Sequence, residues 1–189
     1  MSTGNNNSAA GNSAADVLAF WRAAGEDKWF KKDTAFDAEI TSRFQALWRD
    51  AAAGALADWE AAPESALSLV LVLDQFPRNM FRSKAEAFAS DALARAVAER
   101  AIARGFDQKV PAGERLFFYL PFEHSESLAD QERAVALIDA LGSADLSRWA
   151  ELHADIIRRF GRFPHRNSTL GRTNTPEEQE FLDAGGFAG

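Results

Sequence analysis

The chain has 189 residues, of which 47% are hydrophobic and 26% are charged, and its formal net charge is −7. The length fits one domain with a sizeable core, and the acidic balance excludes general binding to nucleic acid or to an anionic membrane surface. The chain contains no cysteine, which excludes disulfides and thiol catalysis. We therefore expect a cytoplasmic protein that does not bind membranes.

The first thirteen residues, MSTGNNNSAAGNS, are small and polar and lack the basic start and apolar stretch of a secretory signal. We predict a disordered lead-in over residues 1–13, followed by a single helical domain over residues 14–189. The longest apolar run, residues 67–73, is too short to cross a bilayer.

Helix signals follow one another along the rest of the chain. Apolar residues recur at steps of three and four, and glycines stand where helices would stop. The predicted helices cover residues 16–24, 33–54, 63–76, 83–104, 111–120, 127–141 and 146–160, with a short last helix after Thr175. No segment alternates with period two, so we predict no sheet.

The connections are short, which predicts that neighbouring helices pack antiparallel. The alanine-rich stretch of residues 85–103 allows close helix approach. We therefore predict an all-α fold of about seven to eight helices, similar to a tetratricopeptide-like α-solenoid, although the chain has no clean 34-residue repeat.

The first polar segment, residues 73–82, reads LDQFPRNMFR. Because a proline disfavours helix for the residue before it, we expect a helix to end ahead of Pro77. Asp74, Arg78 and Asn79 are candidate ligand-binding residues. The alternative is a structural turn in which arginines bond free helix carbonyls and pair with Asp74.

The second polar segment follows the apolar residues 117–122. Glu123, His124 and Glu126 lie within four residues of one another, and carboxylates near an imidazole can form an acid–base pair. The alternative is capping, with Ser127 as the N-cap of the next helix and Glu126 beside it.

The third segment, residues 158–172, reads RRFGRFPHRNSTLGR and is called the arginine island below. It holds five arginines and His165 but no acid, and guanidinium groups are suited to carboxylate or phosphate. Its arginines would repel one another, so we expect distant carboxylates (Asp74, Glu123 and Glu126), helix carbonyls or a bound anion to neutralise them. In the preceding helix, Asp155 is spaced to pair with Arg158 or Arg159.

The common catalytic templates are absent: the sequence has no Gly-x-Ser-x-Gly elbow, His-Glu-x-x-His, phosphate loop or Gly-x-Gly-x-x-Gly. The histidines, His124, His153 and His165, do not have metal-ligand spacing. We expect neither a metal nor a cofactor.

Five motifs in order resemble a bacterial family known as domain of unknown function 924. They are WF at residues 29–30, LDQFPRN at 73–79, AFASD at 87–91, LPFEHSE at 120–126 and RFGRFPHRN at 159–167. The resemblance covers about residues 16–187 and implies an all-helical fold similar to the tetratricopeptide-like superfamily. It implies no activity, because none is assigned to the family.

Two functions remain open. The first is a site for a small anionic molecule, with acid–base or hydrolytic chemistry. Its candidate catalytic residues are Glu123, His124, Glu126 and His165, and its candidate ligand-binding residues are Asp74, Arg78, Asn79, His153, Arg162, Arg166 and Asn167. The second is a helical scaffold that binds a peptide, a protein or another copy of the chain, with the polar segments as a structural salt-bridge network. Exposed tryptophans on one concave face would favour this scaffold.

Overall fold

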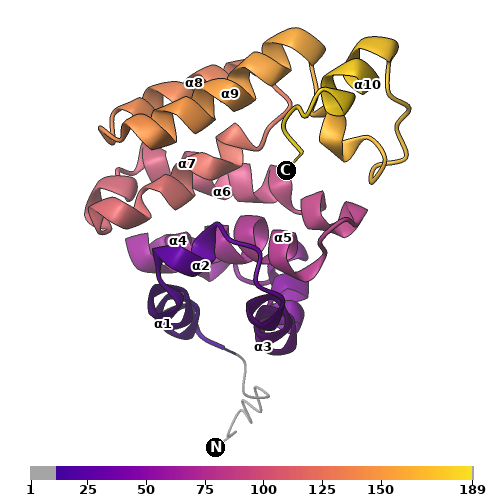
Figure 1. The fold of residues 1–189 in the computed structure, drawn as a ribbon. Coiled ribbons are helices and arrows are strands. Elements are labelled where there is room, and N and C mark those ends of the chain that lie inside the picture. The colour runs from indigo at the N-terminus through magenta and orange to yellow at the C-terminus, as the bar shows by residue number, and fades with distance from the viewer. Residues whose placement is uncertain (1–11, 189) are drawn as a thin grey trace, which may run out of the picture.

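The computed structural model describes residues 12–188, and they form helices in stacked layers (Figure 1). The α-helices of at least two turns are α1 (Ala14–Ala24), α3 (Thr34–Ala52), α4 (Pro63–Val70), α6 (Asp91–Ala103), α7 (Leu116–Glu123), α8 (Leu128–Asp139), α9 (Ala144–Phe160) and α10 (Pro176–Asp183). Within the described residues there is no strand, so the predicted all-α class is confirmed.

Shorter elements connect these helices. They are the helices α2 (Glu26–Trp29) and α5 (Phe76–Met80), the π-helical turn η2 (Leu71–Gln75), and the 3-10 turns η1 (Ala57–Ala61), η3 (Ala85–Phe88), η4 (Asp107–Lys109), η5 (Ala112–Glu114) and η6 (Pro164–Arg166). No helix in this part of the chain has the length and apolar character needed to cross a bilayer.

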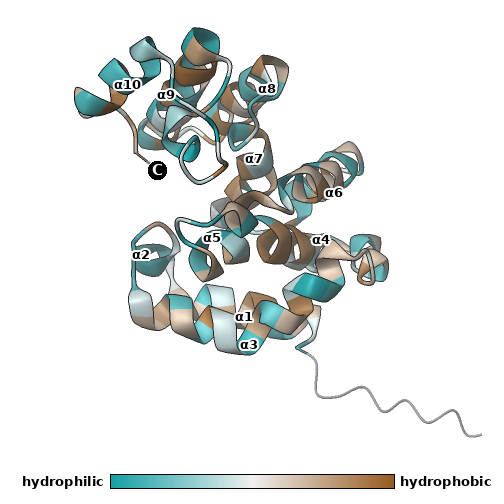
Figure 2. Ribbon diagram, turned by 90° about the vertical axis from the view of Figure 1, so that its right-hand side faces the viewer, coloured by the Kyte–Doolittle hydropathy of each residue, from teal (hydrophilic) through white to brown (hydrophobic). Residues whose placement is uncertain are grey.

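The layers follow the chain order. Helices α1 and α3 lie at one end, α4 and α5 come next, then α6 and α7, and α8 and α9 lie at the other end, with α10 beside them (Figures 1 and 2). The two middle layers are the most apolar, because residues 66–77 and 116–123 are buried without a break. A second, smaller core forms under the arginine island from Ile156, Ile157 and Phe163.

Several predicted helix boundaries are confirmed. Asp33 caps α3 by accepting bonds from the next backbone amides, and Thr175 forms a capping box with Glu178 at the start of α10. Gly161 ends α9 in the left-handed conformation, with φ 67°. That glycine turns the chain from α9 into the rest of the arginine island.

The prediction that a helix ends ahead of Pro77 is wrong. The chain stays helical to Met80, because the backbone widens into η2 and the Phe76 amide donates to the Leu71 carbonyl, five residues back. Pro77 has no amide for the Leu73 carbonyl. The Ser90 hydroxyl donates to that carbonyl instead, at 2.6 Å, and accepts a bond from Trp48 Nε1 at 3.0 Å.

Two further boundaries differ from the predictions. Ser83 does not start a helix: its φ is 60°, and α6 begins only at Asp91. The helix predicted over residues 111–120 starts at Leu116 and runs through Pro121 to Glu123. Ser127 is the N-cap of α8, as predicted, although its side chain makes no capping bond.

Residues 1–11 of the predicted disordered lead-in lie outside the described part of the chain. Its last residue, Ser13, is the N-cap of α1 and forms a capping box with Asp16.

We predict that Ser90→Ala lowers the free energy of unfolding by about 1–3 kcal/mol, because it leaves the buried Leu73 carbonyl and the Trp48 indole without a partner. Urea unfolding at pH 7 measures this change. Ser42→Ala, at an exposed position of α3, is the control, and we expect it to stay within about 0.5 kcal/mol of the wild type. An unchanged midpoint for Ser90→Ala would show that Ser90 does not hold the turn.

Candidate functional site

The site is built around a buried carboxylate. Asp74, in η2, is fully buried and accepts hydrogen bonds from His124 Nδ1 at 2.9 Å and Gln75 Nε2 at 2.6 Å. Arg78 Nη1 lies 3.3 Å from its Oδ1. Burial alone raises the pKa of this carboxyl, but Arg78 and His124 outweigh burial and hold the pKa of Asp74 well below its usual range. Asp74 is therefore ionised at neutral pH.

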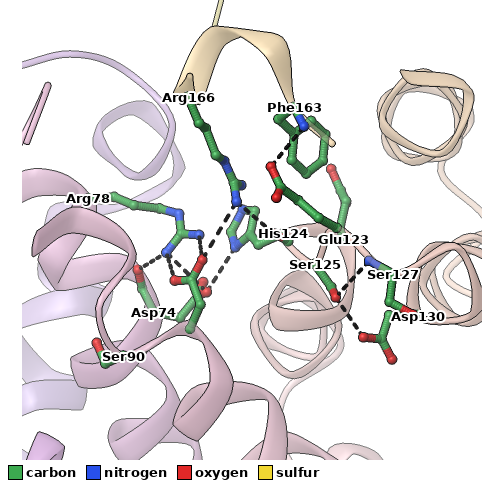
Figure 3. Close-up of polar contacts among 12 residues, drawn as sticks. Asp74, Arg78, Ser90, Glu123, His124, Ser125, Ser127, Asp130, Phe163 and Arg166 are labelled. Carbon is green, nitrogen blue, oxygen red and sulfur yellow. Dashed lines mark hydrogen bonds and ion pairs between the residues drawn. The ribbon is translucent and has the colours of Figure 1, made fainter. Parts of the chain in front are cut away.

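Arg78 lies one turn after Asp74 and is neutralised by two carboxylates. Its guanidinium donates to both oxygens of Asp91, at 2.9 and 3.0 Å. It also donates to the Asp74 carbonyl at 2.7 Å, and Figure 3 shows Arg78 and Asp74 side by side. Both features of the structural turn expected for this segment are thus present. The planar fork of Arg78 is fixed by these contacts and is pre-organised rather than mobile.

Arg166 is the least compensated arginine of the site. It reaches from η6 towards Arg78 and His124 (Figure 3). Its side chain is only 8% exposed, and it donates one hydrogen bond, at 3.0 Å, to the His124 carbonyl. Among the described residues its nearest carboxylate is that of Asp91, 3.8 Å away, and its buried Nε has no partner. Burial, together with the charge of Arg78, lowers the pKa of Arg166 to about 10.

Two aromatic rings lie against the Arg166 guanidinium. Its centre lies 4.6 Å from the Phe88 ring centroid and 4.4 Å from that of Phe163. Such contacts stabilise a partly desolvated cation, and Arg166 also lines a polar cavity.

Two histidines are each oriented by a carboxylate. His124 bonds Asp74 through Nδ1, and His153 bonds Glu123 through Nδ1. Because each carboxylate accepts a hydrogen bond from the Nδ1–H of its histidine, the neutral imidazoles carry their lone pair at Nε2. Neither Nε2 makes a hydrogen bond within the described residues, and both rings line a cavity.

His165 is held differently. Its Nδ1 is buried without a partner, and its ring packs against Phe163 and Phe187. Burial, followed by the charge of Arg166, lowers the pKa of His165 to about 4. This imidazole is therefore neutral at pH 7.

The polar cavity that these groups line has a volume of about 430 Å³. Four cations border it, Lys32, Arg78, Arg82 and Arg166, and Glu123 supplies the carboxylate among its described lining residues. The segments around Pro77 and Pro164, which are far apart in sequence, thus contribute side chains to the same cavity, and Figure 3 shows Arg78 and Arg166 approaching each other beside His124.

Three predicted site residues lie away from this cavity. Glu126 accepts two bonds from Arg172, at 2.7 and 2.9 Å. Arg162 donates to both oxygens of Glu178, and the fully buried Asn167 donates to the same carboxylate. These three candidate residues therefore do not line the polar cavity, and their bonds hold the loop after α9 in place.

Asn79 and Asp74 do not line the polar cavity themselves but contact or adjoin residues that do. Asn79 donates to Asp37 at 2.8 Å and borders a neighbouring, more apolar cavity. Asp74 has no exposed surface and acts only through His124 and Arg78.

The expected neutralisation of the arginine island is right for one carboxylate of the three. Glu126 pairs with an island arginine, whereas Asp74 pairs with Arg78 and Glu123 with His153. Glu177 and Glu178, from α10, supply the carboxylates for Arg159 and Arg162. The predicted pairing of Asp155 with Arg158 is confirmed at 2.6 Å.

Sequence reasoning missed several residues of the site. Asp91 and Phe88 were assigned to the middle of a long alanine-rich helix, although α6 begins at Asp91. The signal available was the polar pair Ser90-Asp91, which is typical of a helix start. No sequence pattern around Lys32 or Phe187 indicates a site, because these residues reach the cavity only through the folding of the whole chain.

Among residues 12–188, no three His, Asp or Glu side chains gather closely enough to hold a metal ion. The donor set of the cavity, dominated by guanidinium groups, suits an anion rather than a cation.

Fold and site together define an all-helical protein with an arginine- and histidine-lined cavity. The chain belongs to the bacterial family of proteins of unknown function DUF924, which matches residues 17–186. The solved structure of the protein of unknown function ATU0120 from Agrobacterium tumefaciens is similar, with 50% sequence identity and a TM-score of 0.88, over 90% of this chain and 97% of that one. No curated protein matches the chain.

We predict that His165 makes the protein less stable in acid. Its pKa, lowered to about 4 in the folded state, is near 6.5 in the unfolded chain, so only the unfolded state binds the proton between those pH values. Stability is therefore fully present above about pH 6.5 and falls as the pH drops towards 4. Urea unfolding of wild type and His165→Gln should show that the wild type loses more stability across this range. A ring proton of His165 that titrates above pH 6 by NMR would contradict this.

Proposed function

We propose that the protein binds a small anionic molecule in the polar cavity and performs acid–base chemistry on it, with hydrolysis as the simplest reaction. The observation that carries this proposal is Arg166. Its side chain is only 8% exposed, and its guanidinium lies 3.8 Å from its nearest described carboxylate. Burial and the nearby charge of Arg78 lower its pKa. Burying a cation with so little compensation costs free energy unless an anion binds to it. A phosphate or carboxylate group bound at the cavity edge of Arg166 would remove that cost.

The charge of the cavity supports an anion. Arg78 is paired with Asp91 and Arg82 with Asp37, and neither aspartate lines the polar cavity. Lys32 and Arg166 form no hydrogen-bonded ion pair with another described residue, so they supply positive charge that is left for a ligand. This local excess lies in a chain whose net charge is −7, which favours one small anion over a polyanion.

His124 is the group best placed to move a proton. The bond from Nδ1 to Asp74 fixes the ring and its tautomer, and Nε2 is left to accept a proton from water or substrate. Once His124 has taken that proton at Nε2, it returns it to the leaving group, and His153, held by Glu123, lines the same cavity as a second oriented imidazole. Arg78 and Arg166 would stabilise negative charge that develops on the substrate.

The second candidate is a tetratricopeptide-like scaffold that binds a peptide or a protein. The stacked helical layers and the 46% exposure of Trp149 favour it. The burial of Trp21, at 1% exposed, does not. The salt-bridge network of this alternative fits Glu126, Arg162 and Arg172, but the carboxylate-oriented histidines at a cavity favour a small ligand.

We predict that the protein binds inorganic phosphate and that Arg166→Gln weakens this binding by about tenfold or more, because a charge-assisted hydrogen bond is lost. Isothermal titration calorimetry at pH 7 measures the dissociation constants, and circular dichroism verifies folding. Arg158→Gln, at an exposed pair with Asp155, is the matched control and should bind as the wild type does. Arg166→Lys, which keeps the charge, should recover part of the affinity. Equal binding by Arg166→Gln and wild type, or no binding by either, would overturn the proposed site.

We predict that the protein hydrolyses an anionic ester and that His124→Gln lowers kcat by about a hundredfold or more, as expected for loss of a general base. The assay follows nitrophenol release from p-nitrophenyl phosphate and from the monoester of p-nitrophenol with succinate. Arg158→Gln should keep wild-type turnover. Turnover that survives His124→Gln, or its absence with both esters in the wild type, would count against this chemistry.

A further inference from the structure

A second cavity, with a volume of about 500 Å³, adjoins the polar one. Its exposed lining is largely apolar, and the apolar side chains include those of Trp29, Phe30, Leu116, Leu120, Leu146 and Trp149, while Lys31, Glu123 and Asp145 are among the charged residues that also border it. The six apolar residues come from α2 and the residue after it, from α7 and from α9, so three helices that are far apart in the chain contribute to this space. We call it the apolar compartment.

The rim of the apolar compartment exposes large side chains to solvent. Phe30 is 58% exposed and Trp149 is 46% exposed. Single exposed apolar residues are common on proteins, but two aromatic residues that border one cavity are typical of a binding surface.

The two compartments meet at the reactive groups. Arg78, His124 and His153 line both of them. A molecule that places a charged group on Arg166 and Arg78 therefore has the apolar compartment directly beyond the imidazoles. The two volumes, about 430 and 500 Å³, each lie within the roughly 300–1,000 Å³ range of small-molecule sites.

Phe187 lies where the polar cavity and the apolar compartment meet. Its ring borders both compartments and packs edge-to-face on His153, with ring centroids 4.6 Å apart, and it lies 6.4 Å from Trp149. Gly186 permits this placement, because a Cβ there would lie 2.6 Å from the Phe181 ring and carbonyl oxygen. The junction thus already accommodates an aromatic ring against an imidazole.

We infer that the ligand is an amphipathic anion, with a phosphate or carboxylate head group on Arg166 and Arg78 and an aromatic group in the apolar compartment against Trp149. This inference rests on the proposed function, because it assigns the substrate class of the same site. A free inorganic anion would use only the polar half, and an uncharged aromatic molecule only the apolar half.

The test compares four probes by isothermal titration calorimetry on the full chain: 1-naphthylphosphonate, which has no ester bond to hydrolyse, 1-naphthoate, inorganic phosphate and 1-naphthol. We expect 1-naphthylphosphonate or 1-naphthoate to bind about tenfold or more tightly than inorganic phosphate and 1-naphthol, because tenfold requires burial of only part of a naphthyl ring. The better of the two naphthyl anions identifies the head group.

Variants separate the two halves of the ligand. Trp149→Ala should remove most of the gain from the naphthyl group and leave the affinity for inorganic phosphate unchanged, and Trp149→Phe should restore part of that gain. Leu93→Ala, at a 43% exposed position on α6, is the matched control and should change nothing.

The outcomes distinguish this inference from the proposed function. If phosphate and both naphthyl anions bind equally, or if Trp149→Ala leaves naphthyl binding unchanged, the amphipathic ligand is wrong and the anion site stands. If 1-naphthol binds as tightly as the naphthyl anions, or if no anion binds, the anion site itself fails and the inference fails with it.

Discussion

The buried carboxylate of Asp74 is the constraint on which the rest of the site depends. An ion without exposed surface costs several kcal/mol in lost hydration unless partners surround it. Asp74 has Arg78, His124 and Gln75 as those partners, and they come from the two central helical layers. Each partner is thereby fixed in position. The requirement to satisfy one charge thus orients an imidazole and a guanidinium at the edge of a cavity.

The arginine island divides into two parts with different physical roles. Arg162 and Arg172 form bidentate pairs with glutamates and hold the loop after α9 against α10 and the turn between α7 and α8. Arg166 is instead held by aromatic rings and a single carbonyl. The donors of Arg162 and Arg172 are thus paired with carboxylates, whereas Arg166 forms no such bidentate pair. That division separates the structural network from the proposed binding site, which the two initial hypotheses treated as alternatives for the whole island.

Local rules predicted the helices where one signal dominated, as at the capping boxes of Ser13 and Thr175 and the left-handed Gly161. They failed where a distant group replaced a missing local bond. Pro77 does not end its helix, because Ser90 satisfies the carbonyl that the proline leaves free. For the same reason Asp91 was overlooked: its importance comes from Arg78, thirteen residues away, and not from its neighbours in sequence.

The all-helical class, the family and the three polar segments of the candidate site follow from the sequence alone, because periodicity, capping residues and unusual side chains are local properties. Which polar residues face the cavity, and which are bonded away from it, depends on the tertiary structure. The same is true of the apolar compartment, with Trp149 and Phe187, that adjoins the histidines. These arrangements depend on contacts between residues far apart in the chain. Each polar side chain is either paired with a distant group or left at a cavity, and no local sequence pattern predicts which of the two occurs.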